Sequence, residues 1–434
     1  MDLDEGTKKI ILDFIATDGF KVLKPLMRET AIEAIKDAKG LPIIFFASEV
    51  CPTLRQDILE NLCLLLQKPI KASEYISDVF ADKERRLRLE KNVRNGFIYI
   101  VQSTNAPDSN LFEALMFIRT AKTSSAERVT FVVPYYGYAR QDQKTKGRDL
   151  ITAKLVSDLI ETAGAYRTVC VDIHAGQIQG YFNGIMDHLT ASKLFAQYIQ
   201  EMVKKNGWED KKIVVISPDA GGKNRAKALA DYLNVKFIIA NKNRKTIGTD
   251  ELSSLTMNTD ESLEDTIAIV IDDIFSTGSS LNLVTSNIKE EKPFKIISCI
   301  THSLFCEGSL EILKQSPIDY FVTTNSTVFP KIVKEKNPEL PIEIISLGSL
   351  IAAAIVNTYF GFSITELFSQ SLPLRIYKSF MTEDQKSNLF KLAELNLSEG
   401  DALQANKQIE MLKYTFLTDS EKVRYDLLKT KIIS

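Results

Sequence analysis

The sequence predicts an α/β protein that contains two doubly wound parallel sheets and a helical extension at each end. Three observations indicate this fold. Short apolar runs recur along the chain, stretches with helical periodicity separate them, and the runs are rich in Ile and Val without an alternation of polar residues. Strands of this composition are buried on both faces, as they are when helices cover both sides of a parallel sheet.

Ten apolar runs form the predicted strands. In chain order they cover residues 42–48, 96–103, 128–136, 167–175, 212–219, 235–240, 266–273, 295–303, 319–325 and 342–347. Residues 150–164 represent the helical stretches between them. There Ile151, Leu155 and Leu159 recur every four positions and mark the expected buried face, and Gly164 is the expected C-terminal stop.

The length of 434 residues has room for about two or three domains. Helical patterns without a strand pattern fill residues 371–434. A break between the two α/β halves is expected near 185–192. The expected division is a helical N-terminal extension at 1–40, an N-terminal α/β domain at 41–190 with 345–370 as a candidate for return to it, a C-terminal α/β domain at 191–344 and a helical C-terminal extension at 371–434.

The composition is that of a soluble globular protein, with 44% hydrophobic residues, 25% charged residues and a net charge of −2. Because the chain has no strong basic character, we expect no nucleic-acid partner. No apolar run reaches the ~18 residues of a membrane span, and no signal-peptide pattern is visible. The five cysteines form no CxxC pair and no zinc spacing. Reduced thiols in the cytoplasm are therefore expected.

Polar residues at the carboxyl ends of the predicted strands are the candidates for chemistry, because ligands bind there in open parallel sheets. The strongest signal is the segment 267–281. Two carboxylates end its strand, and a loop of hydroxyl residues and glycine then opens a helix, which offers N–H groups and hydroxyls to a phosphate. The carboxylates suit two vicinal sugar hydroxyls, so the segment predicts a ribose-5-phosphate cradle; an acidic helix cap is the alternative. The residues of this cradle are Asp272, Asp273, Ser276, Thr277, Gly278, Ser279 and Ser280.

Two further strand ends are candidates for a metal–phosphate site. His174 follows one strand, and Asp219 follows another just before Gly221 and Gly222. Asp219 is of a suitable type to hold Mg²⁺, whereas His is not a preferred direct ligand and is equally suited to the phosphate or the metal's water shell. The alternatives are a satisfied polar histidine and a tight turn before a capped helix.

Two cationic segments follow strands of their own. Arg140, Gln141 and Asp142 lie beside several tyrosines, which suits a nucleotide, and the alternative is a solvated loop. Lys242 and Arg244 open a long polar stretch where a mobile lid would start, and the alternative is a floppy connection.

Taken together and in this order, the segments "YARQD", "DIHAGQIQGYF" and "SPDAGG" resemble the ribose-phosphate pyrophosphokinases (phosphoribosyl-diphosphate synthetases) of the phosphate-regulated class. The resemblance covers residues 41–370. It implies two phosphoribosyltransferase-like domains. It also implies that ATP donates its β,γ-diphosphate to the C1 hydroxyl of ribose 5-phosphate, which releases AMP and serves nucleotide biosynthesis.

The resemblance also implies roles for the candidates above. His174 and Asp219 match magnesium–ATP residues, while Arg140, Gln141 and Asp142 match ATP contacts. Lys242 and Arg244 match the catalytic cations of a flexible loop. The 272–280 segment matches the ribose-5-phosphate site.

Two more sets of residues follow from the resemblance alone. Phe80 would stack on adenine, with Asp82 and Glu84 at the amino edge of the base. In the family this segment reaches across a subunit contact, so a homo-oligomer is expected, with dimers assembling to a hexamer. An allosteric phosphate/ADP site would use Arg94, Arg148, Asp187, Ser363, Thr365 and Phe368.

The chain departs from the family pattern in the ribose-phosphate loop. Ser276 replaces a usual Asp, and Ser279 and Ser280 stand where Gly or Cys and then Thr are common, which bears on ribose affinity more than on the chemistry. Two alternatives stay open: a non-catalytic or regulatory subunit beside a paralogous one, and a phosphoribosyltransferase that consumes the product.

Overall fold

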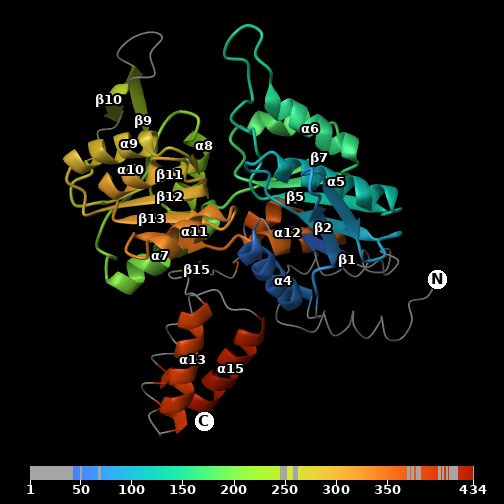
Figure 1. The fold of residues 1–434 in the computed structure, drawn as a ribbon. Helices are drawn as coiled ribbons and strands as arrows, with labels where there is room; N and C mark the ends of the chain where they lie inside the picture. Colours follow the sequence, from blue (N-terminus) through green and yellow to red (C-terminus); the bar gives the residue numbers. More distant parts are fainter. Residues whose placement is uncertain are drawn as a thin grey trace.

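The computed structural model contains two α/β halves and a small helical tail (Figure 1). The expected N-terminal helical extension at 1–40 lies outside the described residues. The structure describes residues 43–48, 51–66, 70–244, 252–257, 262–368, 372, 376–377, 383–398, 402, 405–406, 409 and 419–433.

The first half is built on a five-stranded sheet in the order β1-β4-β5-β6-β7, in which every neighbouring pair is parallel. Helices cover both faces, which explains the unbroken apolar character of these strands. One face packs on α5 and α6, and the other on α4 and α12. The elements are β1 (Ile43–Ala47), β4 (Phe97–Val101), β5 (Arg128–Val133), β6 (Arg167–Val171), β7 (Ile185–Leu189), α4 (Pro52–Leu66), α5 (Ser109–Thr123), α6 (Thr152–Ala163) and α12 (Gly348–Phe360).

The second half is built on an eight-stranded sheet in the order β10-β9-β8-β11-β12-β13-β14-β15. The strands are parallel except the edge strands β10 and β15, which run antiparallel to their neighbours. Helices α7 and α8 cover one face, and α9 and α10 the other. The elements are β8 (Ile213–Ser217), β9 (Lys236–Arg244), β10 (Leu252–Met257), β11 (Ile267–Phe275), β12 (Lys295–Ser303), β13 (Tyr320–Thr324), β14 (Ile342–Ile345), β15 (Ile376–Tyr377), α7 (Ser192–Asn206), α8 (Lys223–Leu233), α9 (Ser279–Glu290), α10 (Ser309–Gln315) and α11 (Phe329–Lys336).

The chain returns to the first half late in the sequence, where α12 packs against α4 (Figure 1). The approach is close at Gly348, since a Cβ there would lie 2.3 Å from the Cβ of Asp57. The carboxylate of Asp57 also accepts hydrogen bonds from Asn325 Nδ2 at 2.9 Å and from the hydroxyl of Ser346. A single apolar core accordingly extends through both halves between the two sheets.

All ten predicted strands are present, but several expectations of detail are wrong. Strand β7 was not predicted; it forms the edge of the first sheet and ends at Leu189, within the stretch near 185–192 where the break between the halves was expected. Helix α6 ends at Gly164 as predicted, with φ +112, yet it buries the face that carries Val156 and Ile160. Leu155 and Leu159 are exposed instead. A two-residue strand, β15, pairs with β14 in a region where only helices were expected.

The tail contains α13 (Glu383–Ser398) and α15 (Asp419–Ile433), which pack through a small core of their own. Phe390 and Leu428 are buried in that core, and Arg424 makes a two-pronged ion pair with Glu394 across the helices. Lys422 of α15 forms an ion pair with Glu60 of α4, which connects the tail to the first half. Within the described residues, no helix has both the length and the hydropathy needed to cross a membrane.

Candidate active site

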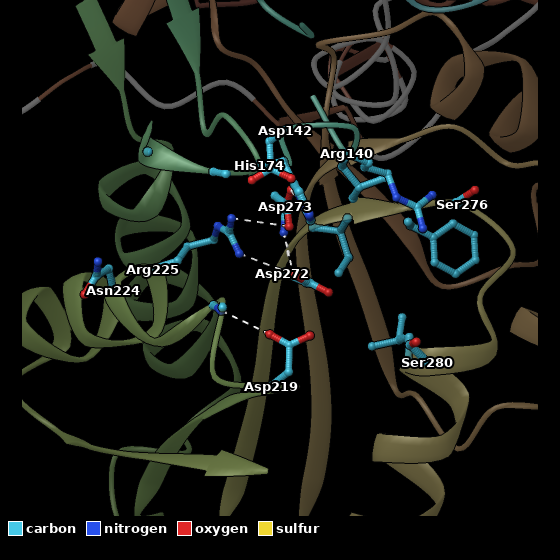
Figure 2. Close-up of a pocket in the computed structure, with 18 of the residues that line it drawn as sticks. Arg140, Asp142, His174, Asp219, Asn224, Arg225, Asp272, Asp273, Ser276 and Ser280 are labelled. Atoms are coloured by element: carbon cyan, nitrogen blue, oxygen red, sulfur yellow. Dashed lines mark hydrogen bonds and ion pairs between the residues drawn. The ribbon is translucent and has the colours of Figure 1, made fainter. Parts of the chain in front are cut away.

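A polar cavity of about 660 Å³ lies where the carboxyl ends of strands from both sheets meet (Figure 2). Arg140 follows β5, His174 follows β6 and Asp219 follows β8. The acidic pair of β11 and the loop after it complete the wall. Among the residues predicted from the sequence, the cavity is lined by Arg140, Asp142, His174, Asp219, Asp272, Asp273, Ser276, Thr277, Gly278 and Ser280.

Asp273 is the centre of a buried polar network that joins the two halves. His174 Nδ1 donates a hydrogen bond to Asp273 Oδ2 at 2.7 Å, from the first half to the second. Arg225 of α8 lies 3.3 Å from Asp273 Oδ1 and 3.2 Å from Asp272 Oδ1 through different guanidinium nitrogens. Figure 2 shows all four side chains converging on one wall of the cavity. The network fixes the acidic pair relative to the imidazole.

The two carboxylates differ in their electrostatic environment. Burial and the charge of Asp273 raise the pKa of Asp272 to about 8. Burial also acts to raise the pKa of Asp273, but the Arg225 guanidinium and the hydrogen bond from His174 hold it below its usual range. The same hydrogen bond raises the pKa of His174. Asp273 is therefore the fixed anion of the pair, and Asp272 is more easily protonated.

Asp219 lies in the turn between β8 and α8, for which the sequence predicted either a metal–phosphate site or a tight turn before a capped helix. Its Oδ1 accepts a hydrogen bond from the backbone N–H of Gly222 at 3.1 Å, and its carbonyl accepts one from the Ser217 hydroxyl at 2.7 Å. The backbone lies close at Gly222, because a Cβ there would lie 2.6 Å from Ser217 Oγ and would force that hydroxyl to move. The tight turn thus exists and presents the carboxylate to the cavity, although no side chain in the described residues caps the N-terminus of α8.

The loop after β11 leads directly into the N-terminus of α9. Gly278 precedes the helix with φ +87, a left-handed conformation that favours glycine. Ser276 and Ser280 line the cavity, whereas Ser279 does not and its hydroxyl lies 3.4 Å from that of Thr277. The exposed Cys306 contacts Ser276, with 3.2 Å between Sγ and Oγ. A helix N-terminus that opens on a hydroxyl-rich loop is suited to bind a phosphate.

The segment after β5 places its polar residues in different directions. Asp142 is buried at the cavity wall, where Gln177 Nε2 donates a hydrogen bond to its carboxylate at 2.5 Å and the Tyr181 hydroxyl donates one to its carbonyl. The side chain of Gln141 is absent from the cavity wall and accepts a hydrogen bond from the Thr152 hydroxyl at 2.5 Å.

Hydrogen bonds below the cavity hold the two sheets together. The Thr301 hydroxyl of β12 donates to Asp172 Oδ2 at 2.6 Å, across the seam between the halves. His302 Nε2 lies 2.9 Å from the Val171 carbonyl across the same seam, and its Nδ1 lies 2.9 Å from Ser326 Oγ. Burial lowers the pKa of His302. These contacts join β12 of the second sheet to the end of β6 in the first.

The predicted loop cations lie on an extended strand. Lys242 and Arg244 fall at the end of β9, where their backbones pair with Leu255 and Leu252 of β10. The chain is therefore a β-ribbon at the point where the sequence suggested the start of a lid. The side chains of both cations lie outside the described residues.

The predicted adenine residues lie apart from the cavity. Phe80, Asp82 and Glu84 form the turn of an antiparallel hairpin made of β2 (Tyr75–Val79) and β3 (Arg85–Leu89). None of the three lines the cavity. The Phe80 side chain is 49% exposed, with the Arg86 guanidinium 5.8 Å from its ring centroid.

The predicted allosteric residues also lie outside the cavity and are spread over several elements. Arg94 lines a separate surface cavity of about 750 Å³ together with Arg88 and Lys91. Asp187 of β7 is held in an ion pair by Arg167. The other predicted residues are Arg148, which is exposed with φ +71, Ser363, whose carbonyl accepts a hydrogen bond from Asn357, Thr365, which is exposed, and Phe368, whose side chain lies outside the described residues.

Arg225 is the main site residue that the sequence reasoning missed. The sequence did contain an indication of its role, because Arg225 lies in the first turn of a helix. A cation there is opposed by the helix dipole, and it needs carboxylate partners when it is buried. The nearer partner, Asp272, lies 47 positions away along the chain and Asp273 follows it, so the pattern near Arg225 did not identify them. Gln143, Gln177 and Asn224 also line the cavity and were not predicted.

The residues around the cavity fit magnesium only when phosphates share its coordination. No cluster of three or more His, Cys, Asp or Glu side chains suited to hold a metal is found in the described part of the chain. The Asp219 carboxylate, however, supplies the oxygen chemistry that Mg²⁺ prefers, and this ion commonly takes one or two carboxylates together with substrate phosphates.

Comparisons with known proteins agree on one family. A family model described as "N-terminal domain of ribose phosphate pyrophosphokinase" matches residues 43–164. A second, described as "Phosphoribosyl transferase domain", matches residues 185–334. Ribose-phosphate pyrophosphokinase 1 of Listeria monocytogenes is 38% identical over 290 residues, which is 67% of this chain and 87% of the relative. The Caldanaerobacter subterraneus enzyme is 37% identical over 325 residues, with 75% and 97% covered.

A solved structure extends the comparison to three dimensions. The phosphoribosylpyrophosphate synthetase from Mycobacterium smegmatis is 30% identical, with a TM-score of 0.64 over 74% of this chain and 99% of that one. The fold is thus that of an α/β protein with a phosphoribosyltransferase domain. The chain belongs to the ribose-phosphate pyrophosphokinase family.

Proposed function

We propose that this chain transfers the β,γ-diphosphate of ATP to the C1 hydroxyl of ribose 5-phosphate and so forms 5-phosphoribosyl 1-diphosphate and AMP. The observation that carries the proposal is the cavity itself. An acidic pair, a hydroxyl-rich loop at a helix N-terminus, and the side chains of His174, Asp219 and Arg140 all face one polar space.

The ribose end of the cavity is formed by β11 and the loop after it. The start of α9 and the hydroxyls of Ser276 and Ser280 would receive the 5-phosphate through N–H and O–H donors. The carboxylates of Asp272 and Asp273 would accept hydrogen bonds from two vicinal hydroxyls of the sugar. The C1 hydroxyl then faces the centre of the cavity, where the diphosphate arrives.

The transfer needs positioning and charge stabilisation more than covalent participation by the protein. Arg140 lies at the wall to contact the phosphates of ATP, and Lys242 and Arg244 are proposed to stabilise the group in transfer. Asp219 would hold magnesium, and His174 lines the same cavity on the other side of the acidic pair. When bound, the ion would neutralise charge on the phosphates and favour departure of AMP. Asp273 keeps the imidazole of His174 oriented through the 2.7 Å hydrogen bond.

The adenine contacts are proposed to come from a neighbouring subunit. Phe80, with Asp82 and Glu84, is exposed on a hairpin away from the cavity of its own chain. Stacking of an aromatic ring contributes ~1 kcal/mol beyond the effect of the buried area. An assembly that places Phe80 on the adenine base would therefore bind ATP more tightly. A homo-oligomer, with dimers assembling to a hexamer, supplies such an arrangement.

The remaining assignments are proposals of the same kind. The division at 41–190 and 191–344 is supported by the separate sheets, and the return of 345–370 by the contact of α12 with α4. The extension at 371–434 is supported by the separate core of α13 and α15, although β15 pairs with the second sheet. A cytoplasmic setting is supported by the five free cysteines. Regulation by phosphate and ADP is proposed for a site that uses Arg94, Arg148, Asp187, Ser363, Thr365 and Phe368.

The test is direct. Purified full-length protein is mixed with Mg-ATP and ribose 5-phosphate, and AMP and the phosphoribosyl product are quantified, with ribose 5-phosphate omitted as the control. We expect AMP and product in equal amounts. Formation of ADP, or AMP that does not depend on the sugar phosphate, would refute the proposal. Complete inactivity restored only by a paralogous chain would favour a regulatory subunit.

A further inference from the structure

Arg225 is a buried cation in the cavity wall that contacts two carboxylates. Its side chain is only 10% exposed, and its two terminal nitrogens reach different carboxylates, at 3.2 Å to Asp272 and 3.3 Å to Asp273. A guanidinium presents donors in a fixed planar fork, so binding two acceptors at once fixes their relative orientation. Figure 2 shows this fork pointing from α8 toward the pair on β11.

The acidic pair needs such a partner to present both oxygens on one side. Neighbouring residues of a strand point to opposite faces, so Asp272 and Asp273 do not converge by strand geometry alone. The backbone N–H of Asp273 donates to Asp272 Oδ1 at 2.9 Å, which turns the Asp272 side chain back along its own strand. Arg225 then contacts the same oxygen and one oxygen of Asp273.

The ion pairs are not what holds α8 in place. Ala226, Leu229 and Ala230 on the same helix are fully buried in the core shared by the two sheets. Apolar burial of this kind is the main source of helix docking, so α8 has an anchor that does not depend on Arg225. The guanidinium can therefore be lost with less effect on the fold than on the shape of the acidic pair.

We propose that Arg225 is a positioning residue that sets the specificity of the site for a sugar phosphate with two free vicinal hydroxyls. The inference rests on the proposed function. Arg225 contacts one oxygen of each carboxylate, and by holding them it fixes the direction of Asp272 Oδ2 and of the remaining acceptor positions of Asp273, which the two sugar hydroxyls would use. A site built to bind a hydroxyl leaves its acceptor unpaired when the hydroxyl is missing, and it therefore rejects the analogue.

The experiment compares ribose 5-phosphate with 2-deoxyribose 5-phosphate in the full-length protein. In Arg225→Gln we expect the ratio of kcat/KM for the two sugars to fall ~10-fold or more, because the acceptors lose their alignment. The KM for ribose 5-phosphate should rise ~10-fold while the KM for ATP changes less than ~3-fold. Lys227→Gln is the matched control, because Lys227 lies on the same helix with an exposed ion pair to Asp231 at 2.6 Å.

Arg225→Lys keeps the proposal testable if the glutamine variant does not fold. A lysine is a single point charge without the fork, so it should give a ratio between those of the wild type and Arg225→Gln. The inference would be overturned if Arg225→Lys kept the wild-type ratio of kcat/KM for the two sugars. It would also be overturned if a variant changed the KM for ribose 5-phosphate and the KM for ATP equally and kept that ratio. An equal effect of Lys227→Gln would overturn it as well. A wild-type protein that forms no AMP would instead refute the proposed function.

Discussion

The cavity wall on β11 and the turn of the β2–β3 hairpin differ in how many contacts a single chain provides to their side chains. At the wall, Asp273 is buried and bonded to residues from both halves, His174 and Arg225. At the hairpin, Phe80 is half exposed and lies away from that cavity. A single chain therefore builds the proposed ribose and phosphate parts of the site by itself, whereas the proposed adenine residues lie outside the cavity of their own chain.

The largest expected effect concerns the proposed catalytic cations. Lys242→Ala and Arg244→Ala should each lower turnover ~10²–10³-fold, because their charge acts on the transition state. ATP binding, measured by equilibrium titration, should stay nearly intact. Equal losses of ATP affinity and turnover would show that these residues bind the nucleotide and do not act on the transferring group.

Asp273→Asn is expected to lower turnover ~10²-fold, because it removes the charge that holds both His174 and Arg225. AMP formation is the measurement. Asp231→Asn, on the exposed face of α8, is the control and should retain wild-type turnover. A loss of less than ~3-fold in Asp273→Asn would mean that the network around this carboxylate is not part of the site.

The strands were predictable because their burial on both faces leaves an unbroken apolar pattern in the sequence. The hairpin strands and the edge strand β7 were not, since β3 reads Arg-Arg-Leu-Arg-Leu and β7 contains Asp187 and His188. On α6, Leu155 and Leu159 suggested the wrong face, because the sheet accepts the smaller Ala153 and Val156 instead.

Most of the cavity could be predicted for a different reason. Its residues follow strands, and the carboxyl ends of parallel strands meet at one edge. Arg225 could not be placed in the same way, because its role depends on partners that only the folded sheet brings near. The hairpin turn was matched through resemblance alone, and no sequence pattern showed that Phe80 would lie outside the cavity.

Phe80→Ala is expected to have a moderate effect that separates the two regions. The KM for ATP should rise ~10-fold with little change in kcat, because stacking contributes to binding alone. The melting temperature should stay the same, since the ring is half exposed in the single chain. An unchanged KM for ATP in the assembled protein would remove the hairpin from the nucleotide site.

The tail should have the smallest effect on turnover. A chain that ends after Tyr377 keeps β15 but loses α13, α15 and the Lys422–Glu60 ion pair. Because the tail packs around its own small core and none of its described residues lines the cavity, we expect AMP formation within ~3-fold of the full-length rate. The matched control is the charge swap Lys422→Glu with Glu60→Lys. A folded but inactive truncated chain would show that the tail belongs to the catalytic unit.

The sharing of one site between two chains is tested most directly by mixing two defective variants. Asp273→Asn has an intact hairpin and a damaged cavity, and Phe80→Ala has the reverse. After joint unfolding and refolding, a mixed oligomer pairs an intact cavity with an intact hairpin from its neighbour. We predict that AMP formation at low ATP then exceeds the sum of the two variants measured separately. Activity equal to that sum in oligomers proven to be mixed would contradict the account.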